Sequence, residues 1–81
     1  MPLLDRHLAT ITIGSEGLGE WRQLPASMAL TVSGARIWRL YDAEFSLSAW
    51  GLGEGEVGEV PTGAYLYVYS TPGSTIKVRL T

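Results

Sequence analysis

The chain has 81 residues, no cysteine and a formal net charge of −2, from eight acidic and six basic residues. A chain of this length forms one domain, here residues 1–81, and buries only about 60 to 65 per cent of the surface that it exposes when unfolded. The lack of cysteine excludes a disulfide framework and a thiolate metal cluster. An acidic balance without a basic run argues against nucleic acid or an anionic membrane as a partner.

The sequence also lacks the usual signals for leaving the cytoplasm. No apolar stretch approaches the roughly 20 residues that a membrane-spanning helix needs. Residues 1–6 contain no basic segment followed by a long apolar run, as a signal peptide has. We therefore expect a soluble protein that stays in the cytoplasm in which it is made.

Alternating apolar and polar residues predict a series of short β-strands. The turn residues Ser33-Gly34 and the segment 71–74 each predict a hairpin between the strands that flank them. Residues 36–50 contain no Gly or Pro and also fit one face of a helix, which we regard as the alternative to two strands. The predicted strands span residues 7–13, 28–32, 36–41, 45–50, 64–70 and 75–80.

The second half of the sequence repeats the plan of the first. Gly17-Leu18-Gly19-Glu20 returns as Gly51-Leu52-Gly53-Glu54, and residues 24–32 return in pattern as residues 60–68. A unit this short cannot bury its apolar face alone, so two copies predict a pseudo-symmetric scaffold. The sequence thus predicts an all-β fold, a small antiparallel β-barrel or sandwich of about six strands. We expect it to consist of two similar halves, roughly residues 8–41 and 45–81.

Three tyrosines, Tyr65, Tyr67 and Tyr69, alternate with apolar residues along the strand predicted at 64–70. A slip of one residue in the pairing would exchange the two faces of this strand. Pro72-Gly73 suits a type II turn inside a longer loop, and the longer loop turns the tyrosines outward. The first repeat agrees, because its apolar residues occupy the positions that match the residues between the tyrosines.

The predicted hairpin places Lys77 and Arg79 beside the tyrosines, where their stems and charges can lie across the rings. Three functions remain open for this face: a second core covered by the N-terminal segment, a protein interface, or a platform on which sugars stack. Three covered tyrosines supply around half of the ~800 Å² that each partner contributes to a standard interface. Sugar binding is disfavoured because Gln23 is the single side-chain amide of the chain.

The tryptophans and the second Gly-rich segment add candidate contacts. Trp38 shares a face with apolar neighbours and is expected in the core. Trp21 and Trp50 border the two Gly-rich segments, where each either covers an end of the barrel or anchors a partner. Residues 51–63 contain five glycines and predict a mobile arm that becomes ordered on a neighbour. The predicted interface comprises Tyr65, Tyr67, Tyr69, Lys77, Arg79, Trp50, Trp21, Leu52 and Val57.

No motif predicts catalysis, a cofactor or a metal. Residues 53–58 match the glycine spacing of a dinucleotide-binding loop, but a proline and a strand follow where that motif requires a helix. The glutamates of this segment, with Glu59, lack the Asp-rich spacing of a calcium loop. His7 is the single histidine and Lys77 the single lysine, so general bases and nucleophiles are few. We expect a non-enzymatic protein without catalytic residues, cofactor or metal ion.

Residues 60–68, Val-Pro-Thr-Gly-Ala-Tyr-Leu-Tyr-Val, resemble the segment that leads into a strand in small β modules of tailed-bacteriophage virion proteins. Such modules include capsid-decoration and tail-associated proteins, and similar segments occur in secreted β-sandwich modules. The resemblance implies a subunit that cements or decorates a shell, often as a symmetric oligomer, and places the chain in the virion.

We therefore expect a structural or assembly protein that binds other copies of itself or a larger scaffold such as a capsid or tail. The main alternative is a carbohydrate-binding module that uses exposed Trp and Tyr residues. A third possibility is an accessory domain that inhibits or adapts an enzyme.

Overall fold

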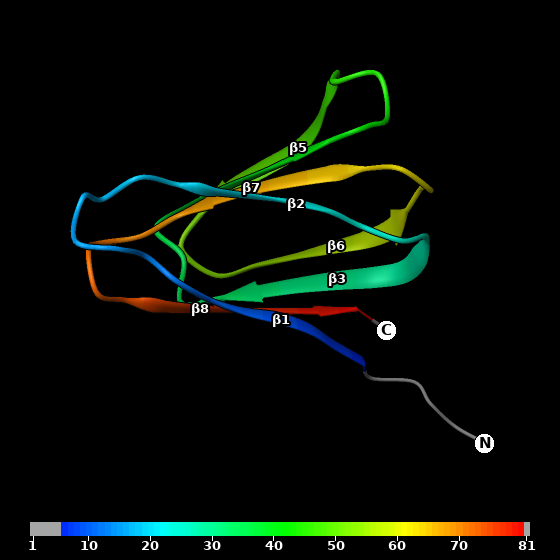
Figure 1. The fold of residues 1–81 in the computed structure, drawn as a ribbon. Helices are drawn as coiled ribbons and strands as arrows, with labels where there is room; N and C mark the ends of the chain where they lie inside the picture. The colour runs from blue at the N-terminus through cyan, green and yellow to red at the C-terminus, as the bar shows by residue number, and fades with distance from the viewer. Residues whose placement is uncertain (1–5, 81) are drawn as a thin grey trace.

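The computed structural model describes residues 6–80, and these form eight antiparallel strands and no helix. Two four-stranded sheets lie face to face: sheet A has the order β1-β8-β3-β6 and sheet B the order β2-β7-β4-β5 (Figure 1). The all-β prediction is confirmed; of its two alternatives, barrel or sandwich, the fold is an open sandwich, and it has eight strands where about six were predicted. The strands are β1 (Arg6–Thr12), β2 (Glu20–Gln23), β3 (Ser27–Ser33), β4 (Ile37–Tyr41), β5 (Leu47–Leu52), β6 (Gly55–Val60), β7 (Tyr65–Tyr69) and β8 (Thr75–Leu80).

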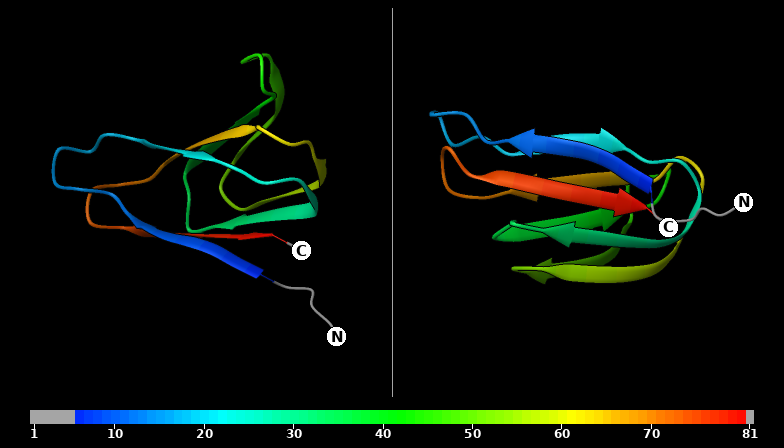
Figure 2. Two further views of the ribbon diagram at one scale, coloured as in Figure 1. Left: turned by 45° about the vertical axis from the view of Figure 1, so that its right-hand side comes forward. Right: turned by 90° about the horizontal axis from the view of Figure 1, so that it is seen from below.

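The strands pair as one long nested hairpin. β1 pairs with β8, β2 with β7, β3 with β6, and β4 with β5 at the tip. The hairpin rolls up because β3 also pairs with β8 and β4 also pairs with β7. Consecutive strands therefore lie in opposite sheets everywhere except at β4 and β5, as the two views of Figure 2 show. Eight strands wound in this way into two sheets form a jelly roll.

Both predicted hairpins are wrong. β3 and β4 lie in different sheets, and so do β7 and β8. Gly34, at a φ of 87°, turns the chain from sheet A to sheet B, and residues 71–74 turn it back. The turn residues mark where the chain reverses, but they do not determine which strand becomes the neighbour. The predicted division into two similar halves is not matched either, because each sheet takes two strands from each half.

The two Gly-rich segments contain strands that the sequence pattern did not predict. Residues 51–63 do not form an arm, because they complete β5 and contain β6, which pairs with β3 from Ser27↔Val60 to Val32↔Gly55. The first Gly-rich segment leads directly into the short strand β2. Residues 36–50, for which a helix was the alternative, form β4, a loop and β5.

The core lies between the sheets and is built from the inner faces of their strands. Leu66 and Val68 of β7 are fully buried while the tyrosines that alternate with them are half-buried and point outward. The predicted inner and outer faces of this strand are therefore confirmed, although its predicted pairing with β8 is wrong. Trp38 is buried in the core as predicted. The buried apolar residues are Ile11, Ile13, Leu24, Leu30, Val32, Ala35, Trp38, Leu40, Val60, Ala64, Leu66, Val68, Ile76, Val78 and Leu80.

Candidate functional site

The outer face of sheet B carries aromatic and aliphatic side chains in three cross-strand rows. Residues paired across an antiparallel sheet share a face, so the pairings define the rows. The face they form is called the aromatic face below. Its rows are Trp21-Tyr67-Arg39-Trp50, Gln23-Tyr65-Tyr41-Leu47 and Tyr69-Ile37-Leu52.

A β-bulge in β5 enlarges this face. The register shifts by one residue between the pairs Leu40↔Ala49 and Tyr41↔Leu47, so Ser48 is the extra residue of β5. Without the shift, Leu47 and Trp50 would point to opposite faces, because side chains alternate along a strand. With it, both side chains join the aromatic face, where Leu47 is 52% and Trp50 60% exposed.

Five aromatic rings pack together at one end of the face. Trp21 lies between Tyr67 and Tyr41, with ring centroids 5.1 and 5.4 Å away. Phe45 stacks on Tyr65 at 4.5 Å with an interplanar angle of 10°, and its edge contacts Trp21 at 5.8 Å. Trp21 is nevertheless 47% and Phe45 56% exposed. The rings thus support one another without being covered by the chain.

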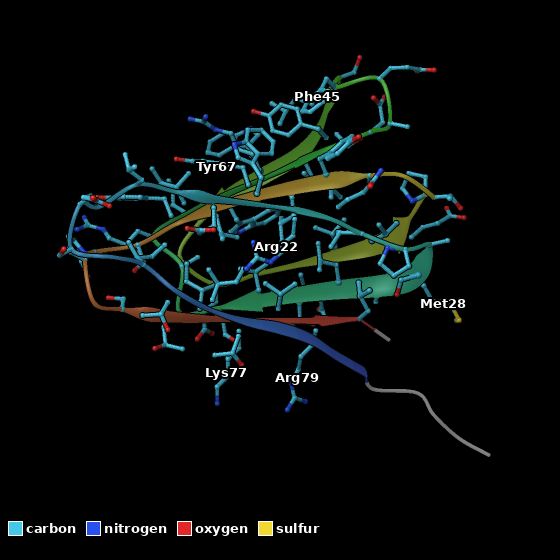
Figure 3. All side chains as sticks on the ribbon, viewed as in Figure 1. Arg22, Met28, Phe45, Tyr67, Lys77 and Arg79 are labelled. Carbon is cyan, nitrogen blue, oxygen red and sulfur yellow. The ribbon has the colours of Figure 1, made fainter. Side chains whose placement is uncertain are left out.

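The β4–β5 loop holds Phe45 over the sheet. The Asp42 Oδ1 accepts hydrogen bonds from the backbone N–H groups of Glu44 and Ser46, both at 2.9 Å. The N–H of Phe45 donates to the Asp42 carbonyl at 2.9 Å, which closes a β-turn. Phe45 then adopts a φ of 64°, a left-handed conformation that costs a non-glycine residue roughly 1–2 kcal/mol. The hairpin rises from the sheet and Phe45 lies on the same side as Tyr67 (Figure 3).

Arg39 is the one charged residue in the three rows, and it lies near their centre. Its guanidinium carbon is 5.9 Å from the ring centroid of Tyr67, close enough for a cation–π contact. Among residues 6–80 the salt bridge that forms joins Arg22 to Glu20, at 3.5 Å, and does not involve Arg39. The aromatic face therefore presents one cation, without an ion-pair partner in the described part of the chain, inside an apolar border.

Six of the nine predicted interface residues meet on the aromatic face. Leu52, which is 70% exposed, and Trp50 come from β5, and Trp21 comes from β2. Trp21 and Trp50 do not cover an end of the fold. The remaining three of the six are Tyr65, Tyr67 and Tyr69 of β7.

Lys77 and Arg79 do not lie beside the tyrosines, which corrects the prediction. β8 belongs to sheet A, so both side chains extend outward from the face of the sandwich opposite to the tyrosines (Figure 3). There they share a polar outer face with Thr10, Ser33 and Thr31, their cross-strand neighbours. Val57 is half-buried and packs against the core, so it is not an exposed contact either.

Phe45, Leu47 and the neighbours on β4 were missed as site residues. The sequence pattern gave residues 36–41 the wrong neighbour, because it paired them with residues 28–32 in a hairpin, whereas β4 lies between β7 and β5. The bulge at Ser48 leaves no signal in the alternation. The alternative that the N-terminal segment covers the tyrosines is contradicted from Arg6 onward, since β1 lies in sheet A. Residues 1–5 lie outside the described residues.

Other features of the molecule offer less chemistry. A shallow hollow of about 380 Å³ opens beside β6 and is lined by Thr31, Val32, Glu54, Gly55 and Glu56. Within residues 6–80 no group of three or more His, Asp or Glu side chains is placed to hold a metal ion. The described chain also has no helix of the length and apolarity needed to cross a membrane.

The fold and site thus define a small jelly-roll protein with one aromatic outer face. Comparison with protein-family models, with curated proteins and with solved structures finds no match. The aromatic face is therefore the feature on which a functional proposal rests.

Proposed function

We propose that the chain is a non-enzymatic structural or assembly protein that binds a neighbouring protein subunit through its aromatic face. The observation that carries this proposal is the contrast between the two outer faces. Sheet A presents Thr, Ser, Lys, Arg and Glu to solvent, whereas sheet B presents tryptophan, phenylalanine, tyrosine and leucine around Arg39. The latter composition is typical of the buried centre of a protein interface, which is rich in aromatic residues and Arg.

The area of the aromatic face suits this role. An aromatic side chain buries about 150–250 Å² when covered, so the exposed parts of Trp21, Phe45 and Trp50 together offer about 300 Å². Leu47 and Leu52 raise the apolar patch to roughly 500 Å², near the upper end of the patches on monomeric proteins, which are often functional. A standard interface takes ~800 Å² from each partner. The patch therefore supplies the centre of such an interface and the surrounding polar residues its rim.

A sugar platform fits this geometry less well. A base or a sugar stacks on an aromatic ring only where the face of that ring is open to the ligand. Four of the five ring pairs are tilted by 39–69°, so these rings are turned against one another. Gln23 is the one amide in the three rows, which leaves few groups to orient hydroxyls. A protein surface with a carboxylate opposite Arg39 matches the face better.

The resemblance of residues 60–68 to phage virion modules supplies the context for the proposal. A jelly roll is found in viral capsid domains, but also in lectins and other proteins, so the fold alone does not decide between them. Within the proposal, the partner is a larger scaffold such as a capsid or tail, the protein works in the virion, and it is otherwise a soluble cytoplasmic protein.

Site-specific photo-crosslinking tests the proposal. A photoreactive phenylalanine analogue replaces Phe45 on the aromatic face or, as the matched control, Lys77 on the opposite outer face, in the cells that make the protein. We expect the probe at position 45 to form one discrete adduct with a protein, identified by mass spectrometry, and the probe at 77 to form none. Equal labelling from both positions, or none from 45, would overturn the proposal. Quenching of Trp21 and Trp50 fluorescence by simple sugars would support the carbohydrate alternative in its place.

A further inference from the structure

We infer that two copies of the chain pair edge to edge through β5, so that sheet B continues into sheet B of the second copy. This contact is made by the backbone of an edge strand, with Trp50 and Leu52 from the margin of the aromatic face beside it. Its occupant is a second copy of the chain and not the scaffold, so it goes beyond the proposed function. It requires neither the scaffold nor its identity.

β5 is an edge strand whose one protective feature, the bulge at Ser48, lies outside its last residues, Trp50 to Leu52. The four strand edges of the sandwich are β1, β6, β2 and β5. Natural edge strands avoid pairing with other chains by carrying charges or proline, by being short, or by a bulge that twists the edge away. β1 contains Arg6, β2 is four residues long and contains Glu20 and Arg22, and β6 contains Glu56. β5, Leu-Ser-Ala-Trp-Gly-Leu, has neither a charged residue nor a proline.

The free backbone groups of β5 can be assigned from the ladder with β4. The Gly53 N–H donates to the Arg36 carbonyl at 2.9 Å, so this end of the ladder begins with a hydrogen-bonded pair. Hydrogen-bonded and non-hydrogen-bonded pairs alternate in an antiparallel ladder. Gly51 then bonds to β4, whereas the N–H and C=O groups of Trp50 and Leu52 point away from β4 to the open edge.

A two-fold axis at Gly51 satisfies all of these groups. In that register Trp50 lies opposite Leu52 of the second copy, and Leu52 opposite Trp50 of the second copy. Each of these pairs exchanges two N–H···O bonds, which gives four backbone hydrogen bonds. The two Gly51 residues face each other in the closer, non-hydrogen-bonded pair, where they bring no side chains into conflict. No charge meets a like charge, because β5 has none.

The same register brings apolar side chains together. Trp50 and Leu52 belong to the aromatic face and are 60% and 70% exposed in the single chain. Across the two-fold axis each would pack beside its counterpart, and aromatic cross-strand pairs stabilise a sheet. The aromatic faces of the two copies would become one continuous surface, with Arg39 of each copy one strand away from the junction. The inferred dimer therefore doubles the surface available to a partner.

Amide hydrogen exchange of the natural chain tests the inference directly. Spectra are compared at about 10 μM and about 1 mM, a range that spans weak association by a small interface. We expect the Trp50 and Leu52 amides to exchange at least about tenfold more slowly at the higher concentration, because pairing removes them from water. The Gly51 amide already bonds to β4 and serves as the internal control. Unprotected Trp50 and Leu52 amides at both concentrations would overturn the inference.

A pair of substitutions separates backbone pairing from side-chain contact. Leu52→Pro removes an N–H that the single chain does not use, whereas Leu52→Ala removes the side chain and keeps the N–H. Proline deletes two of the four hydrogen bonds, so sedimentation equilibrium should show self-association about thirtyfold weaker than in Leu52→Ala. Equal weakening by both substitutions would mean that the side chain makes the contact and would overturn edge pairing. Should Leu52→Pro fail to fold, the exchange experiment decides alone. Neither readout depends on crosslinking from position 45.

Discussion

The substitution Gly55→Ala tests how closely β6 packs on the core tryptophan. Trp38 is 5% exposed, and its indole ring lies against the backbone at Gly51 and Gly55. A Cβ at Gly55 would overlap the ring atoms Cε2, Cζ2 and Nε1. The backbone of Gly55 itself is not left-handed, so alanine meets no conformational strain there. The cost is therefore one of overpacking against a rigid ring with little room to move.

Overpacking of this kind destabilises a protein by typically about 1–3 kcal/mol. In a domain of this size each kcal/mol shifts the melting temperature by roughly 4–8 °C. Gly58→Ala is the matched control, since Gly58 lies on the same strand with nothing within 4 Å of the added Cβ. Removing a glycine from a strand interior should stabilise by about 0.5–1 kcal/mol. The same chemical change is thus expected to have opposite signs three residues apart.

Urea unfolding followed by tryptophan fluorescence, with melting followed by circular dichroism, measures both variants. The variants Trp38→Phe and Trp38→Phe/Gly55→Ala complete a double-mutant cycle that measures the coupling between the two residues. The smaller ring of phenylalanine makes room for the methyl group of alanine. Trp38 Nε1 has no hydrogen-bond partner within residues 6–80, so phenylalanine leaves no acceptor unpaired. We expect a favourable coupling of at least about 0.5 kcal/mol, as for residues in contact. If both alanine variants shift stability in the same direction, or the coupling is zero, the packing argument fails.

Substitutions at three further positions probe the loop and the core. Asp42→Ala removes the acceptor of two loop amides and should lower the free energy of unfolding by about 1–2 kcal/mol in urea titrations, whereas Asp42→Asn should retain most of it. Phe45→Gly loses the stack on Tyr65 but relieves a left-handed residue, so unfolding stability should change by less than about 1 kcal/mol, and a larger loss would contradict this balance. Leu66→Ala should cost about 2–5 kcal/mol by thermal melting because that side chain is fully buried, and a loss below about 1 kcal/mol would place it outside the core.

The local features of this fold could be predicted from the sequence because they depend on neighbouring residues. Period-two alternation located β1, β3, β4, β5, β7 and β8, and it separated Leu66 from Tyr67 correctly. The apolar residues of a strand show which of its two faces points into the core, so this can be predicted without knowing the partner strand. Trp38 was predicted in the core in the same way, from the apolar residues that share its face.

The pairing of strands could not be predicted in this way. β1 pairs with β8 across almost the whole chain, and no local pattern records that choice. Turn residues at Gly34 and Gly73 fit a hairpin as well as a crossing between two sheets. Lys77 was therefore assigned to the wrong side of the molecule although its strand was located correctly. The missed strands have equally plain causes: β2 is four residues long and largely polar, and β6 is rich in glycine.

Folding requirements explain the exposed tyrosines of the aromatic face better than they explain Phe45. Tyrosine and tryptophan favour strands, so their presence on an outer face is partly explained by the sheet itself. Phe45 lies in a loop, in a left-handed conformation that glycine or asparagine would adopt at lower cost. Its stack on Tyr65 returns about as much free energy as that conformation costs, so folding gains little from it. Residues held in such conformations gather at ligand contacts, where surrounding structure fixes them. A phenylalanine held there by Asp42 and left 56% exposed is the residue that the proposed partner would cover.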